Sequence, residues 1–392
     1  MISHLEHLEK IRQNLPATQN IVYMNTGTTG PLPVTAIQAV QEAQQAELYN
    51  GRINKEVVQL KKRAKLETRQ LLAELIKANN DEIVLTRNTT EGINLIISGI
   101  KWQPEDEVIT TNIEHAAVLL PLFLLNQRYG VSIKTARVDG NPLRAFKELI
   151  SPHTRLIAIS HVSYSTGELL PIQEIAQLAH QHGIPVLIDG AQAVGAIPVD
   201  ISELGVDFYS FSGQKWLCGP EGTGALYIRQ ERLNDLHPAY IGYASVEHFD
   251  PEGSFSFHST ARRFEFATTN TPSLLGQGAS IRWLTEYVGL DWAFDRIKTL
   301  HHLTRQELAT VTDVTVLTPA AAAGLISFQL NGVEPQQLVK TLASQGIIIR
   351  TIKELNCVRA SIGFFNTEEE VECLVKAVRQ ARRKACSHSV CR

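Results

Sequence analysis

The sequence is poor in cysteine and has no long hydrophobic run. Only five of its 392 residues are cysteines, an odd number without any Cys-x-x-Cys pair. Such scattered cysteines favour neither a disulfide framework nor a zinc site, and they are typical of a reducing compartment. The longest apolar run, residues 116–125, contains a proline and has about half the length that a membrane-spanning helix needs. The first 13 residues lack the apolar core of a signal peptide. We therefore expect a cytoplasmic protein that does not enter a membrane.

The sequence also has no large excess of charge of one sign. Lys and Arg together number 37 and Asp and Glu 40, which gives a formal net charge of −3. Because nucleic acids and anionic membranes bind basic surfaces, we expect neither as a partner. Hydrophobic residues make up 44% and charged residues 20%, which is the balance of a folded globular protein. At about 150 residues per domain, the length predicts two or three domains.

Short β-branched runs alternate with helix-like stretches between residues 80 and 230. Strands are predicted at residues 82–86, 107–111, 131–138, 155–162, 185–189, 207–212 and 224–229. Since buried strands that alternate with helices form parallel sheets, we predict an α/β fold with a mainly parallel seven-stranded sheet. Its ligand should bind beyond the carboxyl ends of the strands. The later pattern is α+β, so the predicted division is a large domain at 23–260 and a small domain at 261–392, with residues 1–22 packing on the small domain.

Two motifs place polar side chains after buried strands. In PVLIDGAQAVG, Asp189 ends an apolar strand, and Gln192 can face the same cleft. An aspartate at a strand end can also simply cap a loop. In SFSGQKWLCGPEGTGALYI, Lys215 lies between a strand and a glycine-rich turn, flanked by Ser212 and Gln214, which offer polar groups for a phosphate. A lysine in this place suits an amine that must lose its proton and condense with an aldehyde, although a surface lysine is the alternative.

Two further features follow predicted strands. Thr89 and Thr90, in TRNTTEGINLII, lie where a strand gives way to a helix. The N–H groups and the dipole of such a helix N-terminus bind phosphate, although threonines also occur there as simple helix caps. His115, in NIEHAAV, comes just after the next strand. A lone histidine is more often structural, but this position favours stacking on a flat cofactor.

Asp-x-x-Gln after a strand, followed by Ser-x-x-Lys and Gly-Pro-x-Gly-x-Gly, resembles the class V aminotransferase family. This family is the cysteine desulfurase-like branch of the fold type I enzymes that use pyridoxal phosphate (PLP). The resemblance extends over nearly the whole chain, with NTGTTGPLP near the start, RRFEFATTN in the middle and RASIGFFNTEEEV near the end. It implies PLP as the cofactor, Lys215 as the lysine that binds it covalently, and Asp189 as the partner of its pyridinium nitrogen.

The resemblance also assigns the other site residues, and it implies no metal. His115 is implied to lie over the cofactor ring and to be catalytic together with Lys215. The further implied cofactor contacts are Thr89, Thr90, Gln192, Ser212, Gln214 and Thr268. The implied substrate contacts are Thr26, Gly27, Tyr164 and Arg359. Arg350, on the neighbouring predicted strand, is a candidate for a second clamp, although an arginine that simply ends a strand is the alternative. A threonine that matches Thr268 reaches the phosphate of the neighbouring subunit in this family, so a homodimer with shared active sites is implied.

The chain departs from the family where cysteine desulfurases carry their nucleophilic cysteine. That residue lies on a loop between two arginines that match Arg350 and Arg359, and here only the eight residues TIKELNCV separate the two. Cys357 falls on a predicted strand, where a mobile sulfur acceptor would not work. Gln214 and Tyr164 also replace a histidine and an asparagine that are usual in the family.

The missing nucleophilic cysteine favours β-elimination, in which Lys215 removes the Cα proton and a thiolate or persulfide leaves Cβ. The chain is similar to cyst(e)ine C–S lyases, and we predict cleavage of L-cystine or L-cysteine to pyruvate, ammonia and persulfide or sulfide. An iron–sulfur acceptor protein would then be a partner. A cysteine desulfurase that forms alanine, an amino-acid epimerase and a catalytically silent binding protein remain alternatives.

Overall fold

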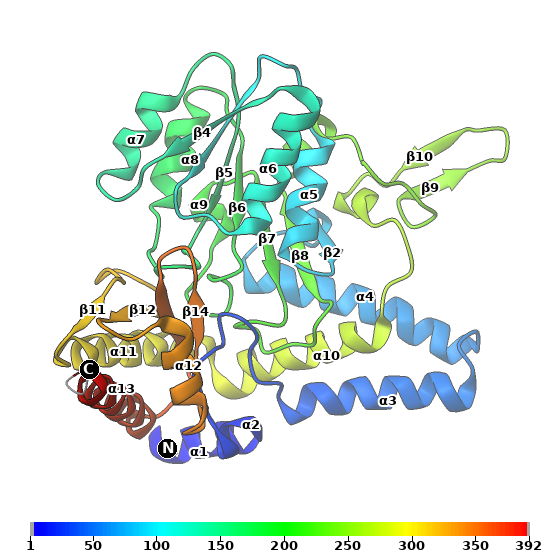
Figure 1. Ribbon diagram of the computed structural model, residues 1–392. Helices are drawn as coiled ribbons and strands as arrows, with labels where there is room; N and C mark the ends of the chain where they lie inside the picture. Colours follow the sequence, from blue (N-terminus) through cyan, green and yellow to red (C-terminus); the bar gives the residue numbers. More distant parts are fainter. Residues whose placement is uncertain (1–3, 390–392) are drawn as a thin grey trace.

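The computed structural model describes residues 4–389, and their side chains up to residue 383. Seven strands form its central sheet in the order β2-β8-β7-β6-β5-β3-β4 (Figure 1). They are β2 (Ile83–Thr86), β3 (Glu107–Thr111), β4 (Ser132–Ala136), β5 (Thr154–Ser160), β6 (Val186–Asp189), β7 (Phe208–Ser212) and β8 (Gly224–Ile228). Only β8 runs antiparallel to its neighbours, β2 and β7. The predicted mainly parallel seven-stranded sheet is therefore confirmed.

Helices cover both faces of this sheet. They include α5 (Thr89–Gly99), α6 (Ala116–Tyr129), α7 (Pro142–Leu149), α8 (Ile172–His180) and the single turn α9 (Ile201–Leu204). Leu156 and Ala158 of β5 pack in the cluster that contains the apolar residues of α5 and α6. Ile157 and Ile159 of the same strand pack with α7 and α8 on the other face. A strand that is buried on both faces needs a continuous apolar run, and this is the pattern that the sequence shows.

Long helices form a layer beside the sheet. They are α3 (Val34–Asn50), α4 (Lys55–Leu75), α10 (Thr271–Arg282) and α11 (Leu290–Ala309), with a π-helical segment at Trp283–Val288. Gly51, with φ 78°, ends α3, and Asn54 caps α4 by accepting a hydrogen bond from the Glu56 N–H. Helix α10 packs against α3 and α4. No helix within residues 4–389 is both long and apolar enough to cross a membrane.

A second sheet has the order β11-β12-β15-β14. Its strands are β11 (Val314–Val316), β12 (Leu325–Leu330), β14 (Arg350–Ile352) and β15 (Cys357–Ser361), and α12 (Pro335–Ala343) and α13 (Glu368–Ser389) pack beside it. At the N-terminus, α1 (His4–Gln13) and α2 (Ala17–Asn20) precede β1 (Val22–Tyr23), which pairs with β13 (Ile347–Ile348). Arg12 of α1 forms an ion pair with Glu370 at 2.9 Å, so the N-terminal segment lies against this part of the chain.

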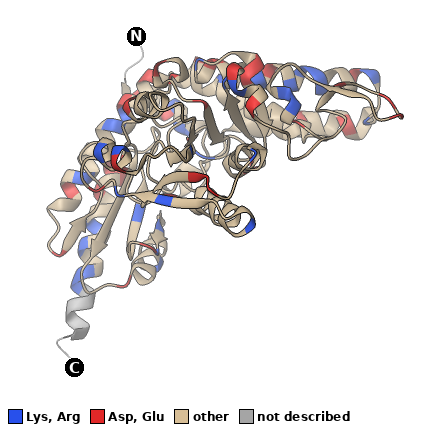
Figure 2. Ribbon diagram, turned by 90° about the horizontal axis from the view of Figure 1, so that it is seen from above, with Lys and Arg blue, Asp and Glu red and all other residues tan. Residues whose placement is uncertain are grey.

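The remaining elements are short. A hairpin of β9 (Val246–Phe249) and β10 (Phe255–Phe257) projects from the body of the molecule (Figure 1). Single 3₁₀ turns occupy Asn80–Glu82, Gln230–Asp235 and Ala261–Phe264. Basic and acidic residues are interspersed along the ribbon, without a face of one sign in the view of Figure 2.

Candidate active site

Most of the predicted site residues lie at the carboxyl ends of the parallel strands. Asp189 is the last residue of β6, and Ser212 is the last residue of the neighbouring strand β7. His115 caps the start of α6, which follows β3, and Thr89 is the first residue of α5. Sheet order therefore brings together residues that are far apart in the sequence.

Thr89 and Ser212 build a polar pocket at the N-terminus of α5. The Ser212 hydroxyl lies 2.6 Å from the Thr89 hydroxyl and accepts the Thr89 N–H at 3.2 Å. Both side chains are buried, whereas Thr90 beside them is exposed. The positive end of the helix dipole and these two hydroxyls suit a phosphate group.

Asp189 is a buried carboxylate without a cation. Its side chain is 6% exposed, and its Oδ1 accepts the Ala191 N–H at 2.9 Å. None of the described side chains forms an ion pair with it. A buried carboxylate without an ion-pair partner is unfavourable, so a cationic group of a ligand should complete this site. The protonated pyridine nitrogen of PLP is such a group.

Lys215 follows β7 in the loop before β8. The pKa of its amine is lowered from 10.5 to about 8, mainly by burial; the Asp189 carboxylate opposes this shift, and the charges of Arg359 and Arg350 contribute to it. Gly30 packs directly against the backbone of this loop, because a Cβ on it would lie 2.1 Å from the Lys215 carbonyl oxygen. A lysine with this pKa releases its proton much more readily near neutral pH than an ordinary lysine does, and condensation with an aldehyde requires the unprotonated amine.

Gln192 and Gln214 differ in the hydrogen bonds that their side-chain amides make. Gln192 donates from Nε2 to the Gly27 carbonyl at 2.8 Å and accepts from Trp216 Nε1 at 2.9 Å. Its amide thus joins the N-terminal loop to the lysine loop. Gln214 Oε1 is buried without a hydrogen-bond partner, as is the Thr26 hydroxyl. These two unpartnered oxygens lie in loops that the sequence assigns to cofactor and substrate.

His115 and Tyr164 form an aromatic pair, with ring centroids 4.8 Å apart at 82°. His115 Nδ1 accepts the Ala117 N–H at 3.1 Å. Burial lowers the pKa of this imidazole; the Asp189 carboxylate opposes the shift and the charge of Lys215 supports it. The ring is therefore neutral near pH 7, and since Nδ1 accepts a hydrogen bond its hydrogen lies on Nε2. Burial raises the pKa of the Tyr164 phenol to about 12, and the nearby Glu354 carboxylate adds to this effect.

Arg350 on β14 and Arg359 on β15 are directly opposite each other in the second sheet. Arg359 is 1% exposed, and its Nη1 donates to the Tyr164 carbonyl at 2.5 Å. Burial, together with the charge of Arg350, lowers its pKa to about 9. Two converging cations without a carboxylate are suited to binding the carboxylate of a substrate.

Thr268 does not lie at the end of a strand with the other predicted site residues. It is exposed, and its hydroxyl lies 2.9 Å from the Tyr243 hydroxyl. Its predicted contact with the cofactor of a second subunit therefore stays a prediction.

Two residues of the site were not found from the sequence. Glu114 is buried and accepts hydrogen bonds from the Thr111 hydroxyl at 2.6 Å and the Ser160 N–H at 3.0 Å, so it ties the ends of β3 and β5 together beside His115. Burial raises its pKa to about 7. Thr28 receives hydrogen bonds from both arginines. Glu114 adjoins His115 in the sequence and could have been noticed there, whereas Thr28 carried no signal beyond its place in NTGTTG.

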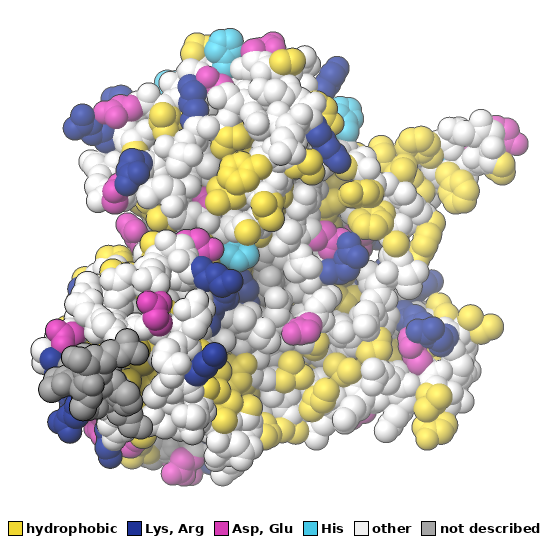
Figure 3. All heavy atoms as spheres, viewed as in Figure 1, with side chains coloured by type: hydrophobic (Ala, Val, Ile, Leu, Met, Phe, Trp, Pro, Cys, Tyr) yellow, Lys and Arg dark blue, Asp and Glu magenta, His cyan; other side chains and the backbone are white. Residues whose placement is uncertain are grey.

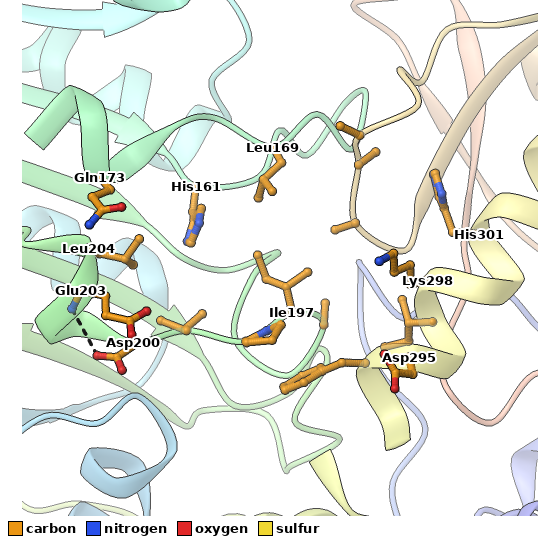
Figure 4. Close-up of a pocket in the computed structure, with 18 of the residues that line it drawn as sticks. His161, Leu169, Gln173, Ile197, Asp200, Glu203, Leu204, Asp295, Lys298 and His301 are labelled. Carbon is orange, nitrogen blue, oxygen red and sulfur yellow. Dashed lines mark hydrogen bonds between the residues drawn. The ribbon is translucent and has the colours of Figure 1, made fainter. Parts of the chain in front are cut away.

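A cavity of about 720 Å³ lies elsewhere, between residues 196–204, α11 and residues 320–323 (Figure 4). None of the residues predicted to bind cofactor or substrate lines it. The His161 ring points into it, and its Nδ1 lies 2.8 Å from the Tyr209 hydroxyl. The backbone N–H of His161 donates to the backbone carbonyl of Asp189 at 2.9 Å, which connects this residue to the site.

Comparison with known proteins identifies the family. A family model described as aminotransferase class-V matches residues 22–374. The chain belongs to this family. A probable cysteine desulfurase of Methanothermobacter thermautotrophicus is 32% identical, with 93% of this chain and 96% of that protein covered.

Two solved structures of an enzyme named C-DES are also similar. One, a variant with glycine covalently linked to the PLP cofactor, has a TM-score of 0.90 and 29% identity, and the match covers 94% of this chain and 98% of that one. The other is a complex of the cystine C–S lyase C-DES with its reaction product cysteine persulfide, and it has a TM-score of 0.89 and 29% identity over 93% and 99% of the two chains.

These matches confirm the predicted family, the fold and a PLP-dependent enzyme. The residues present also fit the cofactor. Lys215 supplies an amine, Asp189 a buried carboxylate without a cation, and Thr89 with Ser212 a phosphate pocket at a helix N-terminus.

Proposed function

We propose that this chain is a carbon–sulfur lyase that cleaves L-cystine, and also L-cysteine, by β-elimination. Cystine and water would give pyruvate, ammonia and cysteine persulfide, and cysteine and water would give pyruvate, ammonia and hydrogen sulfide. The C–S cleavage is supported by the relatives, which include a probable cysteine desulfurase and a cystine C–S lyase.

The bound cofactor supplies the electron sink, because PLP draws electrons from the Cα of an amino acid and makes its hydrogen acidic. Arg359 holds the α-carboxylate with its guanidinium group. Lys215 Nζ, whose pKa is about 8, accepts the Cα proton. The electron pair of the Cα–H bond becomes the Cα–Cβ double bond, and the Cβ–S bond breaks with its pair going to sulfur. The dehydro amino acid hydrolyses to pyruvate and ammonia.

The observation that carries elimination is the four-residue turn at residues 353–356, between β14 and β15. Cys357 is the first residue of β15, pairs with Ile352 and is fully buried. Burial raises the pKa of its thiol to about 11, so little thiolate exists at neutral pH. A cysteine that is fixed in a strand and protonated cannot carry sulfur from a substrate to an acceptor.

The products separate this function from its alternatives. Holoenzyme with cystine should form pyruvate and ammonia in equal amounts. The pyruvate is measured by its reduction with lactate dehydrogenase. Formation of alanine from cysteine, or racemised substrate without any keto acid, would contradict the proposal. The Lys215→Ala variant serves as the control without a base.

A cysteine desulfurase is the second candidate, because the curated relative from Methanothermobacter thermautotrophicus carries that description. Cys373 is exposed, but it lies on α13, which packs against α11 and α12. Cys218 is buried, and burial raises its pKa to about 12. Cys386 and Cys391 lie outside the described side chains. The Cys373→Ser variant tests this candidate. If the variant still forms alanine from cysteine, the protein is not a desulfurase that uses Cys373.

We further propose a homodimer with shared active sites. Hydrophobic side chains gather on the projecting β9–β10 hairpin and the segment beside it (Figure 3), and several of them are aromatic. Those more than half exposed are Tyr240, Tyr243, Phe249 and Phe255. Exposed apolar groups of this size favour burial against a partner, and Thr268 bonds to one of them. Mixing inactive Lys215→Ala and Thr268→Ala proteins should restore activity if subunits share sites, and no recovery would contradict this.

We also propose that an iron–sulfur protein accepts the sulfur and that this chain is located in the cytoplasm. A persulfide product holds its sulfur in a form that can be transferred to a second thiol. The three cysteines with described side chains, Cys218, Cys357 and Cys373, are all free, which suits a reducing compartment. Transfer of labelled sulfur from cystine to a purified cluster scaffold would test the acceptor.

A further inference from the structure

Two like charges face each other in the substrate part of the site. Arg350 and Arg359 form a direct cross-strand pair between β14 and β15. Like charges in this arrangement repel. Among the described side chains, no carboxylate forms an ion pair with either arginine. A neutral group must therefore hold the two guanidinium groups together.

Arg359 also donates to the Tyr164 carbonyl and Arg350 to the Thr351 carbonyl. Among the described residues, the acceptor that both arginines share is the hydroxyl of Thr28. Its Oγ1 accepts a hydrogen bond from Arg350 Nη1 at 3.2 Å and another from Arg359 Nη2 at 3.4 Å. It donates its own hydrogen to Asn25 Oδ1 at 2.8 Å. A hydroxyl has one hydrogen and two lone pairs, so these three partners use its full bonding capacity.

The loop that carries Thr28 is fixed on both sides. The Thr28 N–H donates to the Asn25 carbonyl at 2.9 Å, and the Gly27 carbonyl accepts from Gln192 at 2.8 Å. The Ser361 N–H, at the end of β15, donates to the Met24 carbonyl at 2.7 Å. Thr28 is therefore held in one place relative to the strand of Arg359.

A hydroxyl and a carboxylate at this position would have different effects on the charge of the two arginines. An acidic side chain would also hold both arginines, but its charge would neutralise them and compete with a substrate carboxylate. A threonine orients the two cations and leaves their charge available.

We propose that Thr28 is a positioning residue that holds the Arg350 and Arg359 guanidinium groups side by side for the carboxylates of the substrate. The substrate class is an amino acid with two carboxylates, such as a disulfide of two cysteines, and this identity rests on the proposed function. Arg359 binds the carboxylate at the reacting end, and Arg350 serves the second one.

The test measures ligand binding to the holoenzyme through changes in cofactor absorbance. L-Alanine presents one carboxylate and has no leaving group. 2,7-Diaminosuberate presents two and replaces both sulfurs of cystine by methylenes. Thr28→Val keeps the shape of the side chain and removes both acceptor sites, so the Kd of each ligand should rise about tenfold, as expected when charged hydrogen-bond donors lose their partner. Thr28→Ser should bind both ligands within about threefold of the parent protein, because the hydroxyl is kept.

Thr29→Val is the matched control, because the hydroxyl of the neighbouring Thr29 bonds to neither arginine in the described structure. Cofactor absorbance per protein and the melting temperature should be the same in all variants. The proposal is overturned if Thr28→Val binds both ligands like the parent, if Thr28→Ser is as weak as Thr28→Val, or if only one ligand is weakened.

A second variant keeps the test valid if Thr28→Val does not fold. Thr28→Asp retains acceptors for both arginines but neutralises them, so it should weaken both ligands at least as much. Tight binding by Thr28→Asp would show that the two guanidinium groups do not carry the carboxylates. Failure of the proposed function is seen separately, as the absence of pyruvate from cystine with the parent enzyme, because the binding ligands need no elimination.

Discussion

Replacement of Lys215 by methionine should stabilise the cofactor-free protein at neutral pH. Burial lowers the pKa of this lysine from 10.5 to about 8. The difference corresponds to about 3 kcal/mol by which the fold disfavours the protonated amine. Methionine has a similar length and no charge. Because Lys215 is not completely enclosed, we expect a gain of about 2–3 kcal/mol in the free energy of unfolding near pH 7.

The sign of the pH dependence follows from proton binding. Above about pH 8 the folded protein has released this proton, whereas the unfolded chain keeps it up to 10.5. The unfolded state thus binds more protons in this window, so the stability of the parent protein rises with pH there. At about pH 9.5 the free energy of unfolding of the parent protein should be about 2 kcal/mol higher than near pH 7 through this group. The stability advantage of Lys215→Met should shrink by the same amount.

Urea unfolding of the two proteins, stripped of cofactor with hydroxylamine, measures both quantities. Lys298 is an exposed lysine of α11, and Lys298→Met is the matched control, for which no gain is expected. The reasoning is refuted if Lys215→Met is no more stable than the parent near neutral pH, or if its advantage is the same at both pH values.

Three further predictions concern other parts of the molecule. Glu265→Gln should lower the free energy of unfolding by about 3–5 kcal/mol, measured in urea, because Glu265 and Arg69 are buried and form an ion pair at 2.6 Å. Cys357→Ala should keep the rate of pyruvate formation from cystine within about twofold, whereas a loss of activity would favour a desulfurase that uses this thiol. Gly30→Ala should lower stability by about 1–3 kcal/mol and reduce bound cofactor absorbance, because the added Cβ would lie 2.1 Å from the Lys215 carbonyl.

The central sheet could be predicted from the sequence because its strands are buried on both faces. Apolar runs such as that of β5 then have no polar face, and the helices between them require parallel neighbours. The order of the strands could not be predicted. The antiparallel insertion of β8 between β2 and β7 depends on contacts across the sheet, as does the pairing of β1 with β13. The β9–β10 hairpin was missed because its strands are largely exposed and show no alternating pattern.

In the site, residues that directly follow buried strands could be predicted, because strand ends meet at one edge of the sheet. Asp189 and Ser212 are examples. Gln192 was expected on the cofactor, and the structure adds that its amide is bonded to the Gly27 carbonyl and to Trp216. Thr28 could not be found, since its role depends on an arginine that lies 331 residues later in the chain.

The β14–β15 hairpin connects the missing sulfur acceptor with the arginine pair. In an antiparallel pair, opposite residues lie on one face, and residues two apart along a strand share it. Cys357 and Arg359 therefore share a face with Ile352 and Arg350, their cross-strand partners. The short turn that fixes Cys357 in the ladder is the same turn that sets the two arginines opposite each other. A longer, mobile loop could carry a thiol to the substrate. The short turn fixes the register of the two cations instead, and this favours gripping a substrate during elimination over accepting its sulfur.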